Sequence, residues 1–226
     1  MNAAGEGPAP ARPPGASRLE ALIDALVTGL LRGWLAFYLV AIAVFTTLPF
    51  AAPLLARAGQ DRAASAIYLA YRLSCHQLPH HSWFIGGPKA AYSWPEVQPY
   101  TGLRLDQTLR AFHHPLRDPA LGYQVAFCQR DAAIWLSLLA ASLILAWRLR
   151  RGPVRPLRMR WYLISLIPIA LDGLTQLVGL RESTPLLRTL TGAIFGAATA
   201  WLVLPLLDEG FRELRTASAA RRVGPT

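Results

Sequence analysis

Residues Pro168–Gly192 read PIALDGLTQLVGLRESTPLLRTLTG, and this segment constrains the fold more than any other part of the chain. It begins inside an apolar run that contains the acidic residue Asp172. A charged break at Arg181 and Glu182 follows, and a second apolar run starts at Arg188. Ionisable residues inside a membrane span are costly and usually face a partner or a water-filled site. The segment therefore predicts two membrane helices joined by a polar turn, with a polar site where they meet.

The composition agrees with a membrane protein. The chain has 226 residues, of which 53% are hydrophobic and 16% are charged, whereas about 25% are charged in an average soluble domain. The formal charge of +10 does not indicate nucleic acid, because basic residues gather between apolar runs, as they do in cytoplasmic loops. We expect contact with membrane lipids and no nucleic-acid partner.

Four apolar runs, each long enough to cross a bilayer, predict four transmembrane helices at about 33–55, 125–147, 161–180 and 188–207. The predicted fold class is an all-α, polytopic membrane protein. These helices belong to a single membrane domain at 18–215, between a disordered tail at 1–17 and a loose tail at 216–226.

The segment at 56–124 is predicted to be a long outer loop that contains one short interfacial helix, starting at Asp61. Loops of this length without a function are uncommon. The part at 79–122 is therefore predicted to be a docking surface for protein partners, with the chain acting as a subunit of a membrane complex.

Four spans place both termini on the same side of the membrane. The basic residues before the first span, between the second and third, and after the fourth all lie on that side, which the positive-inside rule makes cytoplasmic. Those between the second and third spans are Arg148, Arg150, Arg151, Arg155, Arg158 and Arg160. We expect a multi-pass protein of the cell membrane with cytoplasmic termini and a Cys/His loop on the outer side.

Polar residues gather near the predicted outer ends of the spans. Asp172 and Gln176 share one helix face, and the charged residues that accompany them are Arg130, Arg181, Glu182 and Arg188. Arginines bind phosphate or carboxylate through forked hydrogen bonds. The alternative is that they pair with nearby acidic residues or extend to the interface. Asp172 is the candidate catalytic residue, as a general base or metal ligand, or else it fixes helix packing.

Close packing of the fourth span is a separate expectation. Gly192, Gly196 and Ala200 form a small-xxx-small ridge, which lets the backbones of neighbouring membrane helices approach closely. We expect these glycines to serve packing.

Four residues have the donor types of a zinc site: Cys75, His76, Cys128 and Asp131. Thiolate, imidazole and carboxylate groups are the usual ligands of tetrahedral zinc. One alternative is a Cys75–Cys128 disulfide, which an oxidising membrane face would permit. Another is two unrelated thiols, and the spacing does not decide among the three.

Several motifs resemble a bacterial and archaeal membrane-protein family catalogued as domain of unknown function 2085. They are Cys75-His76-Gln77, Cys128-x-Arg130, Pro168-x-x-x-Asp172-Gly173-x-x-Gln176-x-x-Gly179-x-Arg181-Glu182-Ser183 and Arg188-x-x-Thr191-Gly192. The resemblance covers about residues 65–205. It implies a small polytopic membrane protein and brings no activity with it.

The chain departs from the family pattern in two places. Asp131 stands where the pattern has a further cysteine, and the interval before Cys128 is enlarged. If the family's cysteines and histidine bind a metal, Asp131 would replace a soft ligand with a harder one. The departure also favours a Cys75–Cys128 disulfide in this member.

The leading functional hypothesis is a binding or accessory role, in which the outer site holds a metal ion or an anionic head group. One alternative is an enzyme acting on a lipid or lipid-linked substrate, with Asp172 as the base. Another is a small ion or solute carrier in which Asp172 is the protonatable group. The sequence leaves open whether the chain is an enzyme.

Overall fold

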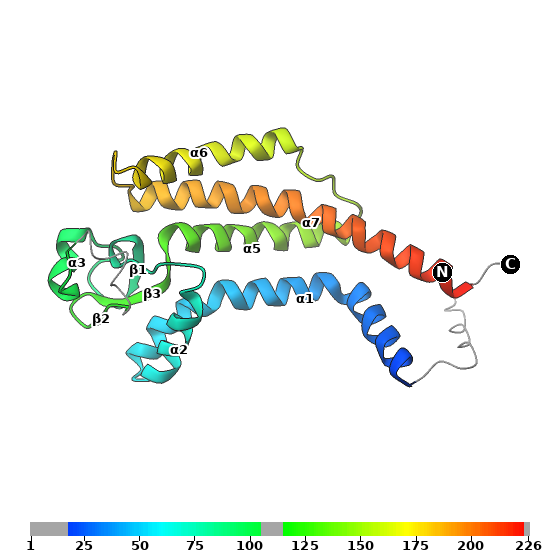
Figure 1. The fold of residues 1–226 in the computed structure, drawn as a ribbon, viewed down its shortest axis with the longest axis horizontal. Helices are drawn as coiled ribbons and strands as arrows, with labels where there is room; N and C mark the ends of the chain where they lie inside the picture. The colour runs from blue at the N-terminus through cyan, green and yellow to red at the C-terminus, as the bar shows by residue number, and fades with distance from the viewer. Residues whose placement is uncertain (1–17, 105–114, 224–226) are drawn as a thin grey trace.

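The computed structural model describes residues 18–104 and 115–223, so the tail predicted at 1–17 lies outside the described residues. Four long helices run side by side (Figure 1). They are α1 (Arg18–Arg57), α5 (Gln129–Leu149), α6 (Met159–Leu177) and α7 (Pro185–Val223). Helix α7 packs between α5 and α6, and α1 lies along α5. A small sheet and the short helices α2 and α3 cover one end of this bundle (Figure 1).

Within the described residues, three helices are long and apolar enough to cross a membrane: α1, α5 and the Pro185–Ser218 part of α7. The third predicted span is helical as α6, but it does not reach the same apolarity. Asp172 and Gln176 lower the hydropathy of its C-terminal half. The structure therefore supports three candidate spans rather than four, and a membrane crossing by α6 stays a prediction.

The first helix is longer than the span predicted at 33–55. It runs without interruption from Arg18 to Arg57, with Pro49 and Pro53 inside it. A proline in a helix leaves the carbonyl four residues earlier without its usual donor. For Pro49 that carbonyl belongs to Phe45, and it accepts a hydrogen bond from Tyr71 Oη at 2.7 Å instead. This substitute donor explains how the helix continues through the proline.

The fold is mostly helical, as predicted, but it is not all-α, because the segment between α1 and α5 contributes an antiparallel sheet with the order β1-β3-β2. Its strands are β1 (Ser82–Ile85), β2 (Arg117–Asp118) and β3 (Gly122–Cys128). Gly122, with φ +91°, and Gly87 bring two backbones together: a Cβ on Gly87 would lie 1.9 Å from the Leu121 carbonyl oxygen. Only glycines permit this approach, which lets β1 and β3 pair.

The second predicted span, α5, starts later than position 125 because strand β3 takes up its first residues. Val125–Cys128 belongs to β3 and is largely buried, so the apolar run that begins at Val125 is part strand and part helix. Helix α5 begins at Gln129, and the Cys128 sulfur accepts a hydrogen bond from the Asp131 backbone N–H as the N-cap. At 21 residues and about 1.5 Å per residue, α5 still matches the thickness of a bilayer core.

The remaining short elements are α2 (Asp61–Tyr71), the 3-10 turn η1 (Pro79–His81) and α3 (Trp94–Thr101). Helix α2 confirms the short helix predicted from Asp61, while its location at a membrane interface stays a prediction. At the other end of the chain, α7 continues to Val223, so most of the tail predicted to be loose at 216–226 is helical.

Two of the three buried apolar clusters among the described residues lie at opposite ends of the bundle. Tyr68 and Phe127 are buried where α1, α2 and β3 meet, and Leu145 and Leu204 are buried between α5 and α7. Glycines let α7 approach α5, since a Cβ on Gly196 would lie 2.2 Å from the Ile134 carbonyl oxygen. The expected role of the glycine ridge in packing is confirmed.

Candidate functional site

A cavity of about 560 Å³ lies where the α2–β1 segment meets the ends of α5, α6 and α7. Thiols, imidazoles, guanidiniums and carboxylates all line it. The lining residues are Ser74, Cys75, His76, Gln77, Leu78, His80, His81, Cys128, Arg130, Asp131, Gly173, Gln176, Leu177, Glu182 and Arg188. The arginine-rich turn between α5 and α6 lies at the opposite end of the helices (Figure 1).

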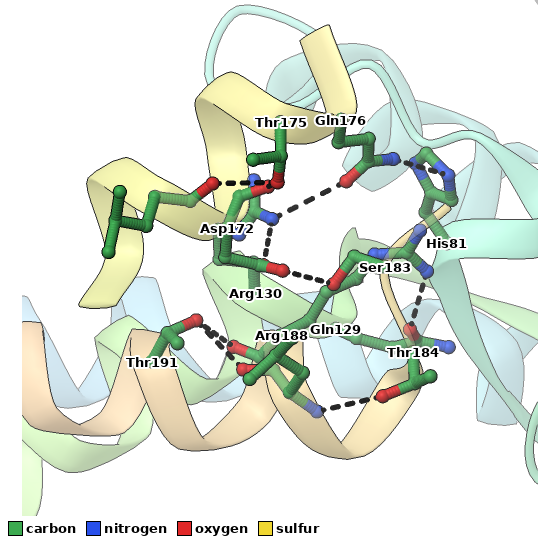
Figure 2. Close-up of polar contacts among 12 residues, drawn as sticks. His81, Gln129, Arg130, Asp172, Thr175, Gln176, Ser183, Thr184, Arg188 and Thr191 are labelled. Atoms are coloured by element: carbon green, nitrogen blue, oxygen red, sulfur yellow. Dashed lines mark hydrogen bonds and ion pairs between the residues drawn. The ribbon is translucent and has the colours of Figure 1, made fainter. Parts of the chain in front are cut away.

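Asp172 lies on α6 beside this cavity and is 1% exposed. Its Oδ2 accepts a hydrogen bond from the Arg130 guanidinium at 2.5 Å, and its Oδ1 accepts from Arg181 at 2.7 Å. Ser183 Oγ also donates to Oδ1, at 2.7 Å. A buried carboxylate is tolerated when it is paired and hydrogen-bonded, and Asp172 has both kinds of partner. It thereby ties α5, α6 and the α6–α7 turn together (Figure 2).

Arg130 reaches Asp172 from the first turn of α5. Its Nη2 also lies 3.5 Å from Gln176 Oε1. The close packing at Gly192 sets its position, because a Cβ there would lie 2.7 Å from the Arg130 carbonyl oxygen. The Arg130 Nε is buried and has no hydrogen-bond partner among the described residues. Since guanidinium nitrogens only donate, Arg130 presents one buried donor that the protein leaves unsatisfied.

Glu182 organises a second group on the cavity wall. Its Oε1 accepts from Arg188 Nη2 at 2.6 Å and lies 2.8 Å from His81 Nε2. Gln176 Nε2 lies 3.1 Å from the same His81 nitrogen (Figure 2). Arg188 is 3% exposed and also donates to Gln129 Oε1 at 3.2 Å. Helix α7 therefore supplies a buried guanidinium that is held from two sides.

His80 and His81 are kept neutral. Burial lowers the pKa of His81 to about 3, and the nearby charges of Arg188 and Arg130 lower it further. Burial likewise lowers the pKa of His80 to about 3, with smaller contributions from His81 and Arg188. His80 is 8% exposed, and its Nδ1 has no hydrogen-bond partner among the described residues. The contribution of the arginines indicates a positive potential at this wall.

The two cysteines lie at the other side of the cavity as free thiols, and the predicted disulfide is not formed in the structure. Cys75 Sγ accepts from the Cys128 backbone N–H at 3.1 Å, and the Cys128 thiol donates to Asp131 Oδ2 at 3.2 Å. One ligand atom from each of these three residues lies within 4.8 Å of the others. His76 is exposed and does not belong to this group.

The structure thus brings together most of the residues that the sequence suggested. Arg130, Asp172, Gln176, Arg181, Glu182 and Arg188 form one polar network, and Cys75, Cys128 and Asp131 lie on the neighbouring wall. Sequence reasoning considered His80 and His81 as possible metal or pH-sensing residues but left them out of the site, because adjacent histidines in a long loop carry no periodic signal. It also missed Gln129 and Ser183, whose roles depend on contacts between helices.

The comparisons with known proteins agree with the resemblance noted in the motifs. Residues 119–202 match a family model described as "Predicted membrane protein (DUF2085)". The chain is also 29% identical over 177 residues to the uncharacterized protein MJ1492 of Methanocaldococcus jannaschii, which covers 76% of this chain and 90% of that protein. No solved structure gives a significant match. The resemblance to this family is confirmed over residues 119–202, which include Cys128 but not Cys75.

Proposed function

We propose that this integral membrane protein binds an oxyanion of the phosphate class in the cavity between the ends of α5, α6 and α7. The observation that carries the proposal is the buried Arg130 Nε, which has no acceptor among the described residues and belongs to a residue lining the cavity. A buried donor without a partner costs about 1–3 kcal/mol, and more when it belongs to a charged group. A phosphate oxygen would satisfy it with a strong, charge-assisted hydrogen bond.

The charge balance of the network supports an anion. The guanidiniums of Arg130, Arg181 and Arg188 face the carboxylates of Asp172 and Glu182. This ion-paired network, counted without the Asp131 carboxylate on the neighbouring cavity wall, has a formal surplus of one positive charge. Arginine cannot lose its proton in a protein. A unit charge about 4 Å from an anion contributes about 4 kcal/mol at an effective dielectric constant of 20. An anion is therefore favoured over a neutral ligand on the side of the cavity that Arg130 and Arg188 line, away from Asp131.

The same potential opposes a cation at the histidines. His80, His81 and Glu182 each have a ligand atom within 4.8 Å of the others, a donor set that divalent metals use. However, Arg188 is bound to the Glu182 carboxylate at 2.6 Å, and the arginines help to lower the pKa of both histidines. Neutral histidines beside arginines are better suited to donating a hydrogen bond to an oxyanion.

Asp172 has a positioning role in this proposal. Its three donors come from Arg130, Arg181 and Ser183, so the carboxylate aligns two guanidiniums for a ligand. A carboxylate with three donors is poorly prepared to act as a base or to carry a proton. This arrangement favours a binding role over the enzyme and carrier alternatives.

We further propose that the cavity opens on the outer side of the membrane and that α6 is a fourth span. Arginines lie over exposed tryptophans at the opposite end of the bundle, where Arg151 Cζ is 3.6 Å from the Trp147 ring centroid and Arg160 Cζ is 5.5 Å from that of Trp161. Tryptophans concentrate at membrane interfaces and arginines on the cytoplasmic side. The tryptophans support a membrane interface at that end, and the arginines support its cytoplasmic side.

Thermal unfolding of the purified protein in a nonionic detergent tests the proposal. Dihexanoyl phosphatidic acid, which carries a phosphate monoester, is compared with dihexanoyl phosphatidylcholine, with inorganic phosphate and with sodium chloride at equal ionic strength. A ligand at 100 times its Kd stabilises by about 2.7 kcal/mol, which raises Tm by roughly 5–10 °C in a chain of this size. We expect this shift with phosphatidic acid if the anion is a lipid head group, and with inorganic phosphate also if it is a free anion.

The matched variants are Arg130→Gln and Arg160→Gln. Arg160 is an exposed arginine at the far end of the bundle, so its variant should keep the full shift, whereas Arg130→Gln should lose it. A wild-type Tm that phosphate and phosphatidic acid raise no more than sodium chloride does would contradict the proposal.

A further inference from the structure

Beyond the anion-binding cavity, the segments that carry the two cysteines meet in a second arrangement. Cys75 follows α2, is 5% exposed and is held next to the first turn of α5. Cys128 is the N-cap of α5, and Asp131 lies one turn into the same helix. The donor atoms of all three lie within 4.8 Å of one another, on the wall of the cavity.

Backbone N–H groups are directed at both sulfurs. Cys75 Sγ accepts from Cys128 N at 3.1 Å and from Gln77 N at 3.5 Å, and Cys128 Sγ accepts from Asp131 N at 3.4 Å. Hydrogen bonds of this kind surround metal-bound ligands and stabilise their charge. Cys128 lies at the start of α5, next to the positive end of the helix dipole.

The turn that carries Cys75 is rigid and strained. Gln77 has φ +53°, a left-handed conformation that non-glycine residues seldom adopt. Two buried hydrogen bonds hold it: Gln77 Nε2 donates to the Tyr68 carbonyl at 2.8 Å, and the Gln77 carbonyl accepts from Gln124 Nε2 at 2.6 Å. Strain of this kind persists only where the surroundings impose it, and it clusters at ligand-binding turns. Here it directs the Gln77 N–H toward the Cys75 sulfur.

We propose that Cys75, Cys128 and Asp131 together bind one divalent metal ion of the zinc class, with its remaining coordination position facing the cavity. With Zn–S bonds of about 2.3 Å and Zn–O bonds of about 2.1 Å, a tetrahedral ion holds its ligand atoms about 3.5–3.8 Å apart. The observed limit of 4.8 Å requires only small side-chain movements. Two sulfur ligands exclude magnesium and calcium, which prefer oxygen.

The charges around the sulfurs favour a cation, in contrast to those around the histidines. Cys75 is buried, and an Asp131 carboxylate oxygen and the Cys128 sulfur lie within 4.8 Å of its sulfur. Two thiolates and a carboxylate repel one another without a counter-ion, and a divalent cation removes that repulsion. On binding, each thiol releases its proton to solvent as its sulfur–metal bond forms, so two protons leave for each ion.

Cobalt(II) titration of the full-length protein in detergent, after reduction and removal of the reductant, tests this site. Thiolate ligation gives a sulfur-to-cobalt charge-transfer band in the near ultraviolet. We expect one cobalt per chain with this band, and zinc should abolish it by displacement. Cys75→Ser or Cys128→Ser should reduce the band per bound ion and weaken binding by at least about 10-fold, since even second-shell losses cost that much.

Matched controls separate this site from the anion cavity. Asp131→Asn should keep the charge-transfer band but weaken cobalt binding. The Arg160→Gln variant, at the far end of the bundle, and the charge-neutral His80→Gln/His81→Gln pair should leave the cobalt affinity unchanged. Bound zinc should protect the wild-type thiols from an alkylating reagent, and this measurement needs no variant. Two free thiols without a charge-transfer band, or thiols that zinc does not protect, would overturn the proposal. A disulfide that survives reduction would overturn it as well.

Discussion

Replacement of Asp172 by asparagine is the most informative single change, because the side chain keeps its size while it loses its charge and exchanges one acceptor oxygen for an amide NH2 donor. The carboxylate is 1% exposed and is bound by Arg130, whose side chain is 24% exposed, and by Arg181, whose side chain is 39% exposed. Removing one partner of a buried ion pair costs about 3–5 kcal/mol. The half-exposed Arg181 contributes little, as surface pairs do, so we expect a loss of about 3 kcal/mol. This loss corresponds to a fall in Tm of about 6–12 °C.

Thermal unfolding in detergent measures this loss, and a double-mutant cycle identifies its source. If the cost comes from leaving the Arg130 guanidinium without a counter-ion, Arg130→Gln combined with Asp172→Asn should cost less than the sum of the single changes. The Ser183 hydroxyl provides a milder comparison, since Ser183→Ala removes one hydrogen bond worth about 1–2 kcal/mol. The reasoning is refuted if Asp172→Asn costs less than about 1 kcal/mol, or if the two changes are additive.

Three further changes test the packing and the charge state of the site. Gly196→Ala should destabilise the protein by at least about 2 kcal/mol, because the added methyl group overpacks the contact between α7 and α5. Gly210→Ala, in open space on the same helix, should instead stabilise the protein by up to about 1 kcal/mol. Urea unfolding in detergent compares the two variants. Tyr71→Phe removes the hydroxyl that donates to the Phe45 carbonyl, which Pro49 leaves without its usual helix donor. The same urea assay should show a loss of about 1–2 kcal/mol in the free energy of unfolding. An unchanged free energy would show that this donor is dispensable. His80 and His81 have pKa values of about 3 in the folded protein, against an ordinary value of 6.5. The free energy of unfolding should therefore be highest above pH 6.5 and should fall as the pH drops toward 3, by up to about 1.4 kcal/mol per pH unit for each histidine. The double glutamine variant should flatten this pH dependence, and an unchanged slope in that variant would contradict the assignment to the two histidines.

The helical framework could be predicted because long apolar runs have few alternatives in the absence of charges. The start of α5 shows where this reasoning fails. Val125–Cys128 is a short apolar stretch that Gln129, Arg130 and Asp131 separate from the rest of α5. A short apolar run does not distinguish a buried strand from a helix. The deciding feature is the contact between Gly87 and Gly122, which brings together residues 35 positions apart and leaves no local pattern.

The charged part of the site could also be anticipated, because Asp172 is conspicuous inside an apolar run and its arginine partners lie near the ends of the same spans. The pairing of Asp172 with Arg130 could not be anticipated, because that contact depends on how closely α5 approaches α7 at Gly192. His80 was left out of the predicted site for a related reason: its burial is imposed by the sheet and by α3, including an edge-to-face contact with Trp94.

The central claim is that the buried Arg130 Nε is satisfied by a phosphate-class anion, and anomalous diffraction tests it most directly. Crystals of the protein soaked in arsenate, a phosphate analogue with a strong anomalous signal, would locate the anion. We expect an anomalous peak in the cavity, with an arsenate oxygen about 2.7–3.2 Å from the Arg130 Nε, and no such peak in Arg130→Gln crystals. Arsenate bound only outside the cavity, or a peak that persists in the variant, would contradict the account.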